Sequence, residues 1–138
     1  MRGGAKFPWK PEHALGLPDV DRQHQELFRI VNELHAASGR IKGEAAARRA
    51  LEKLINYACY HFATEERIFQ EIGLPKAKVR EHIQHHEEFV RKVKGFRDAL
   101  DNGDPIGAGL AAFAAEWLVN HTSKLDLEYA KEYLKSRE

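Results

Sequence analysis

The sequence predicts an all-α protein, an up-down-up-down four-helix bundle with an irregular N-terminal arm. No run alternates polar and apolar residues with β-branched side chains, so we expect no strand. Prolines and glycines fall in short breaks between long stretches of helical periodicity, and short connections make successive helices antiparallel. We expect the helices at Asp19–Ser38, Glu44–Ile72, Lys76–Asp101 and Pro105–Lys135.

The breaks between the expected helices carry residues that end one helix and begin the next. Residues 1–18 combine prolines, glycines and aromatic residues, which predicts an arm that packs on a bundle formed by residues 19–138. Asp19 and Asp104 precede helical stretches and are candidate N-caps. Glycine favours the end of a helix and proline the first turn, and both residue types stand between the second and third helices.

The composition narrows the classes of function. The chain has 138 residues, 31% of them charged and 43% hydrophobic, with a formal net charge of +1. This length fits one domain, and the near-zero charge argues against a nucleic-acid partner held by phosphate contacts. A single cysteine excludes a disulfide framework and any multi-thiolate metal site. The longest apolar stretch, around residues 107–119, is too short to span a membrane, and no secretory signal is visible. We therefore expect a cytoplasmic protein without membrane insertion.

Eight histidines stand against one cysteine and one methionine, and their positions on the helices indicate a common site. In the second helix, His61 and Glu65 lie one turn apart on the apolar stripe, whereas Glu66 points well off it. A buried glutamate is costly unless it is neutralised, and no lysine or arginine shares this stripe. In the third helix, His82 and His86 lie near the centre of the apolar stripe.

The first and last helices add further inward histidines. His24 shares an apolar stripe of the first helix with His35, but eleven residues separate them by about 16 Å, so His35 does not reach the same site. His121 lies on the apolar face of the last helix. Asp126 stands at i+5 from it and joins that face only through a π-type turn, a feature that concentrates at functional sites. His85 falls at the edge of the third helix's stripe.

Five inward histidines and one or two inward carboxylates predict a metal centre. One histidine on an apolar face is more often a hydrogen-bonded core residue than a ligand, but burying the whole set without a metal leaves large polar costs. Histidine with carboxylate and no thiolate suits iron, manganese or zinc. Two ions suit the set better than one. If two carboxylates and an oxo or hydroxo group bridge the two ions, three histidines bind one ion and two bind the other. One coordination position then stays open on the ion with two histidines. No glutamate stands three residues before a histidine, which argues against a ferritin-like site.

Four sequence motifs, one on each expected helix, carry a family resemblance. They are Leu15-Gly16-Leu17-Pro18-Asp19-Val20-Asp21-Arg22-Gln23-His24, then His61-Phe62-Ala63-Thr64-Glu65-Glu66, then His82-x-x-x-His86 followed by Phe89, and Trp117-Leu118-Val119-Asn120-His121 with Asp126. In this order and spacing, over roughly residues 9–130, the chain resembles the hemerythrin family, and within it the single-domain bacteriohemerythrins.

The resemblance implies two iron ions in a non-haem, oxo- or hydroxo-bridged centre with dioxygen as its ligand. The implied ligands are His82, His86 and His121 on the six-coordinate iron, His24 and His61 on the five-coordinate iron, and Glu65 and Asp126 as bridges. The candidate residues of the oxygen pocket, for which core packing is an equally good explanation, are Phe28, Phe62, Trp117 and Leu118. The candidates for orienting the imidazoles are Asp21 and Gln23.

The expected function is reversible dioxygen binding, for storage, transport or delivery to an oxygen-using enzyme, by a monomer without catalytic residues. Two alternatives stay open: an oxygen or redox sensor that acts through a separate partner, and a di-iron scavenger or peroxidase-like enzyme. Ligation by neutral histidines stabilises high-valent iron less than a carboxylate-rich site does, and this favours a binding protein over an enzyme.

Overall fold

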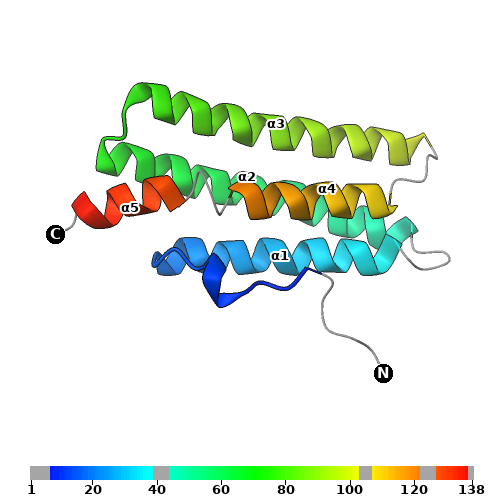
Figure 1. Ribbon diagram of the computed structural model, residues 1–138. Helices are drawn as coiled ribbons and strands as arrows, with labels where there is room; N and C mark the ends of the chain where they lie inside the picture. Colours follow the sequence, from blue (N-terminus) through cyan, green and yellow to red (C-terminus); the bar gives the residue numbers. More distant parts are fainter. Residues whose placement is uncertain (1–6, 39–43, 103–106, 122–126, 137–138) are drawn as a thin grey trace.

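The computed structural model describes residues 7–38, 44–102, 107–121 and 127–136, and the regular elements of these segments are all helical. The all-α prediction is confirmed. Helices α1, α2 and α3 run antiparallel in turn, and α4 and α5 together return along them (Figure 1). No described helix is long and apolar enough to cross a membrane. The elements are η1 (Pro11–His13), α1 (Pro18–Ser38), α2 (Glu44–Ile72), α3 (Lys76–Asp101), α4 (Gly107–Asn120) and α5 (Leu127–Ser136).

Within the last expected helix, Pro105–Lys135, the structure describes two helices, α4 and α5, and the backbone at His121 adopts the π-helical conformation. A π-type turn leaves the regular i→i+4 hydrogen-bond ladder, so it ends the α-helical path of α4. The i+5 spacing predicts such a turn at this point. Asp126 itself lies outside the described residues.

A glycine turn joins α2 to α3. Gly73 has a φ of +66°, its N–H bonds to Gln70 C=O at 3.3 Å, and the N–H of Leu74 bonds to Phe69 C=O at 3.1 Å. These two bonds form a Schellman motif, which needs the left-handed conformation that glycine adopts at low cost. Pro75 then precedes the first turn of α3. The short turn brings α3 back along α2, so that the inward histidines of both helices face each other.

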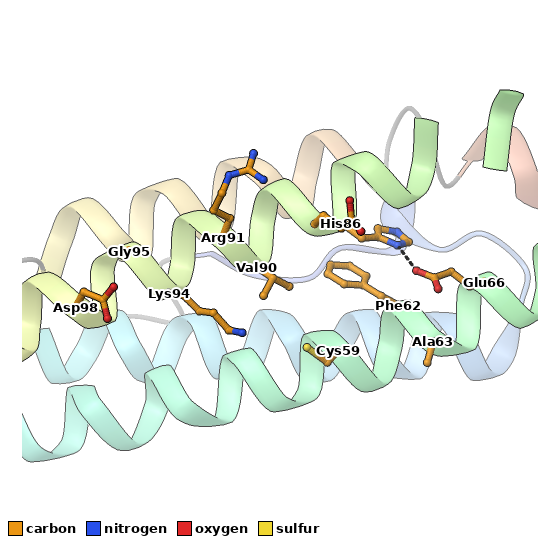
Figure 2. Close-up of a pocket in the computed structure, with 11 residues that line it drawn as sticks. Cys59, Phe62, Ala63, Glu66, His86, Val90, Arg91, Lys94, Gly95 and Asp98 are labelled. Carbon is orange, nitrogen blue, oxygen red and sulfur yellow. Dashed lines mark hydrogen bonds and ion pairs between the residues drawn. The ribbon is translucent and has the colours of Figure 1, made fainter. Parts of the chain in front are cut away.

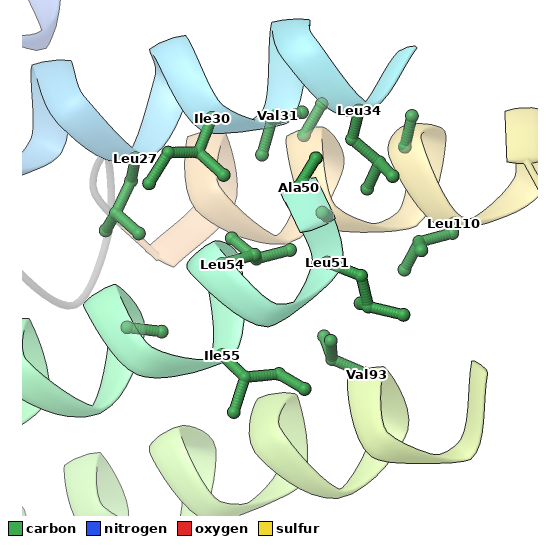
Figure 3. Packing of buried hydrophobic residues seen from close by; sticks show 14 of the residues in the cluster. Leu27, Ile30, Val31, Leu34, Ala50, Leu51, Leu54, Ile55, Val93 and Leu110 are labelled. Atoms are coloured by element: carbon green, nitrogen blue, oxygen red, sulfur yellow. The ribbon is translucent and has the colours of Figure 1, made fainter. Parts of the chain in front are cut away.

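Two apolar clusters stabilise the bundle. The larger one packs leucine, isoleucine and valine side chains of α1 and α2 against α3 and α4 (Figure 3). The smaller one joins the start of α1 to the end of α2 and to α5. Along α2 the larger cluster ends at Phe62 and the smaller begins at Ile68. Glu65 therefore lies on the stretch of α2 between two apolar clusters.

The described part of the N-terminal arm lies against α1. Asn32 holds it at one point, since the Phe7 N–H donates to Asn32 Oδ1 at 2.8 Å and Asn32 Nδ2 donates to Phe7 C=O at 2.9 Å. Asp21 holds it at another, accepting the N–H groups of Leu15 and Gly16 at 2.8 and 3.2 Å. These bonds satisfy arm backbone groups that belong to no regular helix.

Candidate metal centre

Histidines from four helices gather around one buried glutamate. Glu65 on α2 is fully buried, and each of the five histidines that the sequence places inward is at most 4% exposed. One comes from α1, one from α2, two from α3 and one from the end of α4. They are His24, His61, His82, His86 and His121.

The first group of donor atoms joins α1 to α2. The Nε2 atoms of His24 and His61 are 2.9 Å apart, and they lie 3.9 and 3.4 Å from Glu65 Oε2. Two imidazole nitrogens that bind one ion at about 2.1 Å, about 90° apart, have nearly the same separation. The three side chains each offer one ligand atom, all within 4.8 Å of one another, so this group is able to hold one metal ion.

The second group of donor atoms uses the other oxygen of Glu65. Oε1 lies 3.0 Å from His86 Nε2 and 3.6 Å from His121 Nε2, and these three side chains also form a group able to hold a metal ion. Each carboxylate oxygen therefore faces a different pair of histidines. This is the arrangement of a carboxylate placed between two metal positions.

The contact between Glu65 and His86 tests whether the cluster suits a cation. Oε1 and Nε2 are 3.0 Å apart but lack hydrogen-bond geometry, and neither buried atom has another hydrogen-bond partner in the described part of the chain. A buried polar atom without a partner costs about 1–3 kcal/mol. A metal ion would accept a lone pair from both atoms, and nitrogen and oxygen donors suit iron, manganese or zinc. The residues present therefore fit a metal.

The electrostatics of the cluster keep Glu65 ionised. Burial alone raises the pKa of its carboxyl, but the attraction of His61 and the neighbouring imidazoles of His121 and His86 outweigh burial and hold the pKa well below its usual value. A ligand carboxyl must be deprotonated to bind a metal ion. Glu65 therefore meets this requirement at neutral pH.

A chain of hydrogen bonds determines which nitrogen of His61 carries the proton. The Thr64 hydroxyl donates to the carbonyl of Tyr60, so its oxygen accepts from Gln23 Nε2 at 3.3 Å. Gln23 Oε1 is thereby directed to His61 Nδ1, at 2.8 Å, where an amide oxygen acts only as an acceptor. The proton of neutral His61 consequently sits on Nδ1, and the Nε2 lone pair faces the donor group. Gln23 is one of the two residues that the sequence suggests for this task.

Tyr129 contacts the site, and it is not among the residues predicted from the sequence. Its hydroxyl donates to Glu65 Oε2 at 2.8 Å, and the side chain is 1% exposed. A buried tyrosine normally finds a partner for its hydroxyl, and Tyr129 stands three residues after Asp126 in the last motif. The residue type and its position close to the last motif are visible in the sequence, but they do not identify Glu65 as the acceptor of the hydroxyl.

Glu66 is the second missed contact. The helix position of Glu66 does point off the apolar stripe of α2, yet its Oε2 lies 3.2 Å from His86 Nδ1 on α3. The pair stands at one end of a cavity of about 710 Å³ between α2 and α3, drawn in Figure 2. The side chain of Glu66 is 39% exposed, whereas that of His86 is 3% exposed.

Two of the four expected pocket residues stack on site imidazoles. The ring of Phe62 lies parallel to His86 at 3.9 Å, and that of Trp117 lies on His121 at 4.4 Å. Phe28 and Leu118 are buried in the larger apolar cluster, to which Phe62 also belongs. The aromatic rings restrict the two imidazoles to one orientation and cover them with apolar surface.

Two predicted site residues, His82 and Asp21, do not belong to the two donor groups of the described structure. His82 is buried beside the donor groups, with its ring 6.1 Å from that of His121, but it is not a member of either group among the described residues. Asp21, expected to orient an imidazole, instead binds the backbone of the arm with both oxygens. It lies in the first turn of α1, where a carboxylate meets backbone N–H groups ahead of the helix.

The three remaining histidines lie outside the donor groups of the described structure. His13 packs against Phe28 with ring centroids 5.3 Å apart, and His35 contacts Phe7 at 5.5 Å. His85 is half-buried at the rim, where its ring lies 6.4 Å from that of His121.

The fold and the site together define a metal-binding helical bundle with a histidine-rich, carboxylate-linked donor set. The family model described as "Hemerythrin HHE cation binding domain" matches residues 15–133. The chain belongs to the hemerythrin family, as its motifs predict.

Individual relatives agree with this assignment. The chain is 31% identical over 125 residues to "Bacteriohemerythrin" of Pseudomonas aeruginosa, covering 91% of this chain and 80% of that protein. It is 32% identical over 126 residues to "Myohemerythrin" of Riftia pachyptila, covering 89% and 90% of the two chains. A solved structure of wild-type hemerythrin superposes with a TM-score of 0.84 at 26% identity, covering 94% of this chain and 98% of the other.

Proposed function

We propose that this protein binds dioxygen reversibly at a non-haem di-iron centre, for storage, transport or delivery to an oxygen-using partner. The observation that carries the proposal is the position of Glu65, whose two oxygens face two separate pairs of histidines. Membership of the hemerythrin family supports iron as the metal and dioxygen as the ligand.

The proposed ligand set divides between two iron positions. His24 and His61 hold one position, with Oε2 of Glu65 on their side. The imidazoles of His86 and His121 hold the other, with Oε1 of Glu65. In an oxo- or hydroxo-bridged di-iron centre, His82 would join this second position and Asp126 would supply the second carboxylate. The position held by His24 and His61 would then have fewer protein ligands and would take dioxygen.

The chain's own residues orient the ligand side chains and exclude water from the centre. When bound, the two irons supply the electrons for taking up dioxygen and giving it back. Gln23 holds the His61 proton on Nδ1, and Tyr129 donates to the bridging carboxylate. Phe62 and Trp117 present apolar surface to the imidazoles of His86 and His121, which excludes water and the protons it carries. Exclusion of protons keeps the binding reversible.

We further propose a binding role rather than an enzymatic one, in a monomeric, cytoplasmic protein. Neutral imidazoles dominate the donor set, and they stabilise high-valent iron less than carboxylates do. Turnover of hydrogen peroxide or nitric oxide at a sustained rate would favour the enzyme instead, and sedimentation tests the monomer.

Iron loading and oxygen uptake test the proposal. Anaerobic loading of the metal-free chain is expected to give two irons per chain and to take up one dioxygen for each pair, released again under argon. His61→Ala and Glu65→Ala should hold fewer than two irons, whereas His85→Ala, a histidine outside the donor groups, should still hold two. Full iron loading of Glu65→Ala would remove Glu65 as the bridge, and a single iron in the unchanged chain would overturn the di-iron centre.

A further inference from the structure

Glu66 reaches the metal centre from the opposite side of His86. It follows Glu65 directly on α2, and successive helical side chains point about 100° apart. Glu65 therefore enters the centre while Glu66 faces the cavity between α2 and α3, where its Oε2 lies 3.2 Å from His86 Nδ1 (Figure 2). Two adjacent glutamates thus contact opposite nitrogens of one imidazole, because Oε1 of Glu65 is 3.0 Å from His86 Nε2.

The contact with Glu66 determines the tautomer of His86. An ionised carboxylate only accepts hydrogen bonds, so the proton of a neutral His86 sits on Nδ1. The lone pair then resides on Nε2, the atom that faces Glu65 and the second donor group. Phe62 stacks on the imidazole at an interplanar angle of 5°, which fixes the plane of the ring. Glu66 and Phe62 together preset His86 for a metal ion.

The partner of His86 differs in charge from the partner of His61. On the other side of Glu65, the neutral amide of Gln23 accepts from His61 Nδ1, and Gln23 is 2% exposed. A carboxylate partner increases the electron-donating strength of an imidazole more than an amide does. The side chain of Glu66 is 39% exposed, so the carboxylate keeps part of its contact with water.

We propose that Glu66 is a positioning residue that acts through His86 and strengthens, by its negative charge, metal binding at only one of the two positions. The proposal rests on the di-metal centre proposed above. The amide at Gln23 gives the His61 position no such support. The two positions therefore differ in affinity and in redox potential for a reason that lies outside the ligands themselves.

Glu66→Gln isolates the charge, since the amide keeps the size of the side chain and an oxygen that accepts a hydrogen bond. The matched control is Glu87→Gln, which removes the same charge from the lining of the same cavity. No described hydrogen bond joins Glu87 to a histidine. Circular dichroism and thermal unfolding of the metal-free variants verify that both fold.

The readout is the stepwise binding of Co²⁺ to the metal-free chain, followed by chelator competition and by the visible bands of the bound ion. We expect two Co²⁺ per chain in every variant, with one of the two binding constants of Glu66→Gln reduced about 10- to 100-fold. The other constant, and both constants of Glu87→Gln, should match the unchanged chain. In the iron-loaded protein, Glu66→Gln should raise the reduction potential of one iron, because a neutral partner stabilises the ferric state less.

Unchanged binding constants and potentials in Glu66→Gln would overturn the proposal, as would an equal loss in Glu87→Gln. An equal weakening of both positions would also contradict it, since among the described residues His86 is the one member of the two donor groups that Glu66 contacts. Failure of the unchanged chain to bind a second Co²⁺ would refute the di-metal centre itself. The two proposals therefore fail by different results.

Discussion

The hydroxyl of Tyr129 offers a sharp test of how the buried centre is held. Tyr129→Phe removes one oxygen atom and leaves the ring, which packs in the smaller apolar cluster. The lost bond is 2.8 Å long and ends on Glu65, a carboxylate with no exposed surface, so water does not replace the donor. A hydrogen bond to a charged group contributes about 1.5–3 kcal/mol.

That loss converts to a measurable shift in melting temperature. With an unfolding entropy of about 2.1 cal/mol/K per residue, the 138-residue chain should melt about 5–10 °C lower. Differential scanning calorimetry of the iron-loaded protein gives the shift, and denaturant unfolding gives the free energy of unfolding. Tyr60→Phe removes the same atom from a side chain that is 56% exposed, and it should change stability by less than about 0.5 kcal/mol. If Tyr129→Phe behaved like this control, the hydroxyl would not hold Glu65.

Three further outcomes follow from the structure. Leu54→Ala opens a cavity in the larger apolar cluster and should lower the free energy of unfolding by about 2–5 kcal/mol while iron per chain stays at two, as measured by denaturant titration and iron assay. Gly73→Ala places a Cβ on a residue with a φ of +66° and should lower the free energy of unfolding by about 1–2 kcal/mol in the same titration. The cause is backbone strain, because nothing lies within 4 Å of the added atom, and an unchanged free energy of unfolding would refute it. Lowering the pH from 7.5 to 5 should release iron, because protons compete with the metal ion for the imidazole nitrogens, whereas the pKa of Glu65 is held well below its usual value. Iron retained through dialysis at pH 5 would contradict histidine ligation.

Much of the fold follows from local sequence signals. The bounds predicted for the second and third helices, Glu44–Ile72 and Lys76–Asp101, coincide with α2 and α3, because the turn between them contains the glycine and proline that such a turn requires. Helical periodicity alone also turns the inward histidines of α2 and α3 to the core, where the structure buries them. The division of the last segment into α4 and α5 does not follow from periodicity, since apolar residues continue on both sides of His121.

Contacts between helices were harder to predict than faces of single helices. The helix position of Glu66 is outward on α2, yet its side chain is long enough to reach His86 on the neighbouring α3. Tyr129 reaches Glu65 across more than sixty residues of sequence. Both contacts depend on how far one helix is shifted and rotated against the next, which a one-helix projection does not contain. The same limit explains why the partners of Asp21 were not predicted: they are backbone groups ahead of its helix rather than an imidazole across the bundle.

The most direct measurement of the central claim is the optical spectrum of the iron-loaded protein, reduced under argon and then aerated. The reduced protein should be nearly colourless in the visible range, because its ligands are imidazoles and carboxylates. Charge-transfer bands should appear in air, vanish when oxygen is removed and return over repeated cycles. Bands that fail to appear, or that bleach irreversibly within one cycle, would contradict reversible dioxygen binding at this centre.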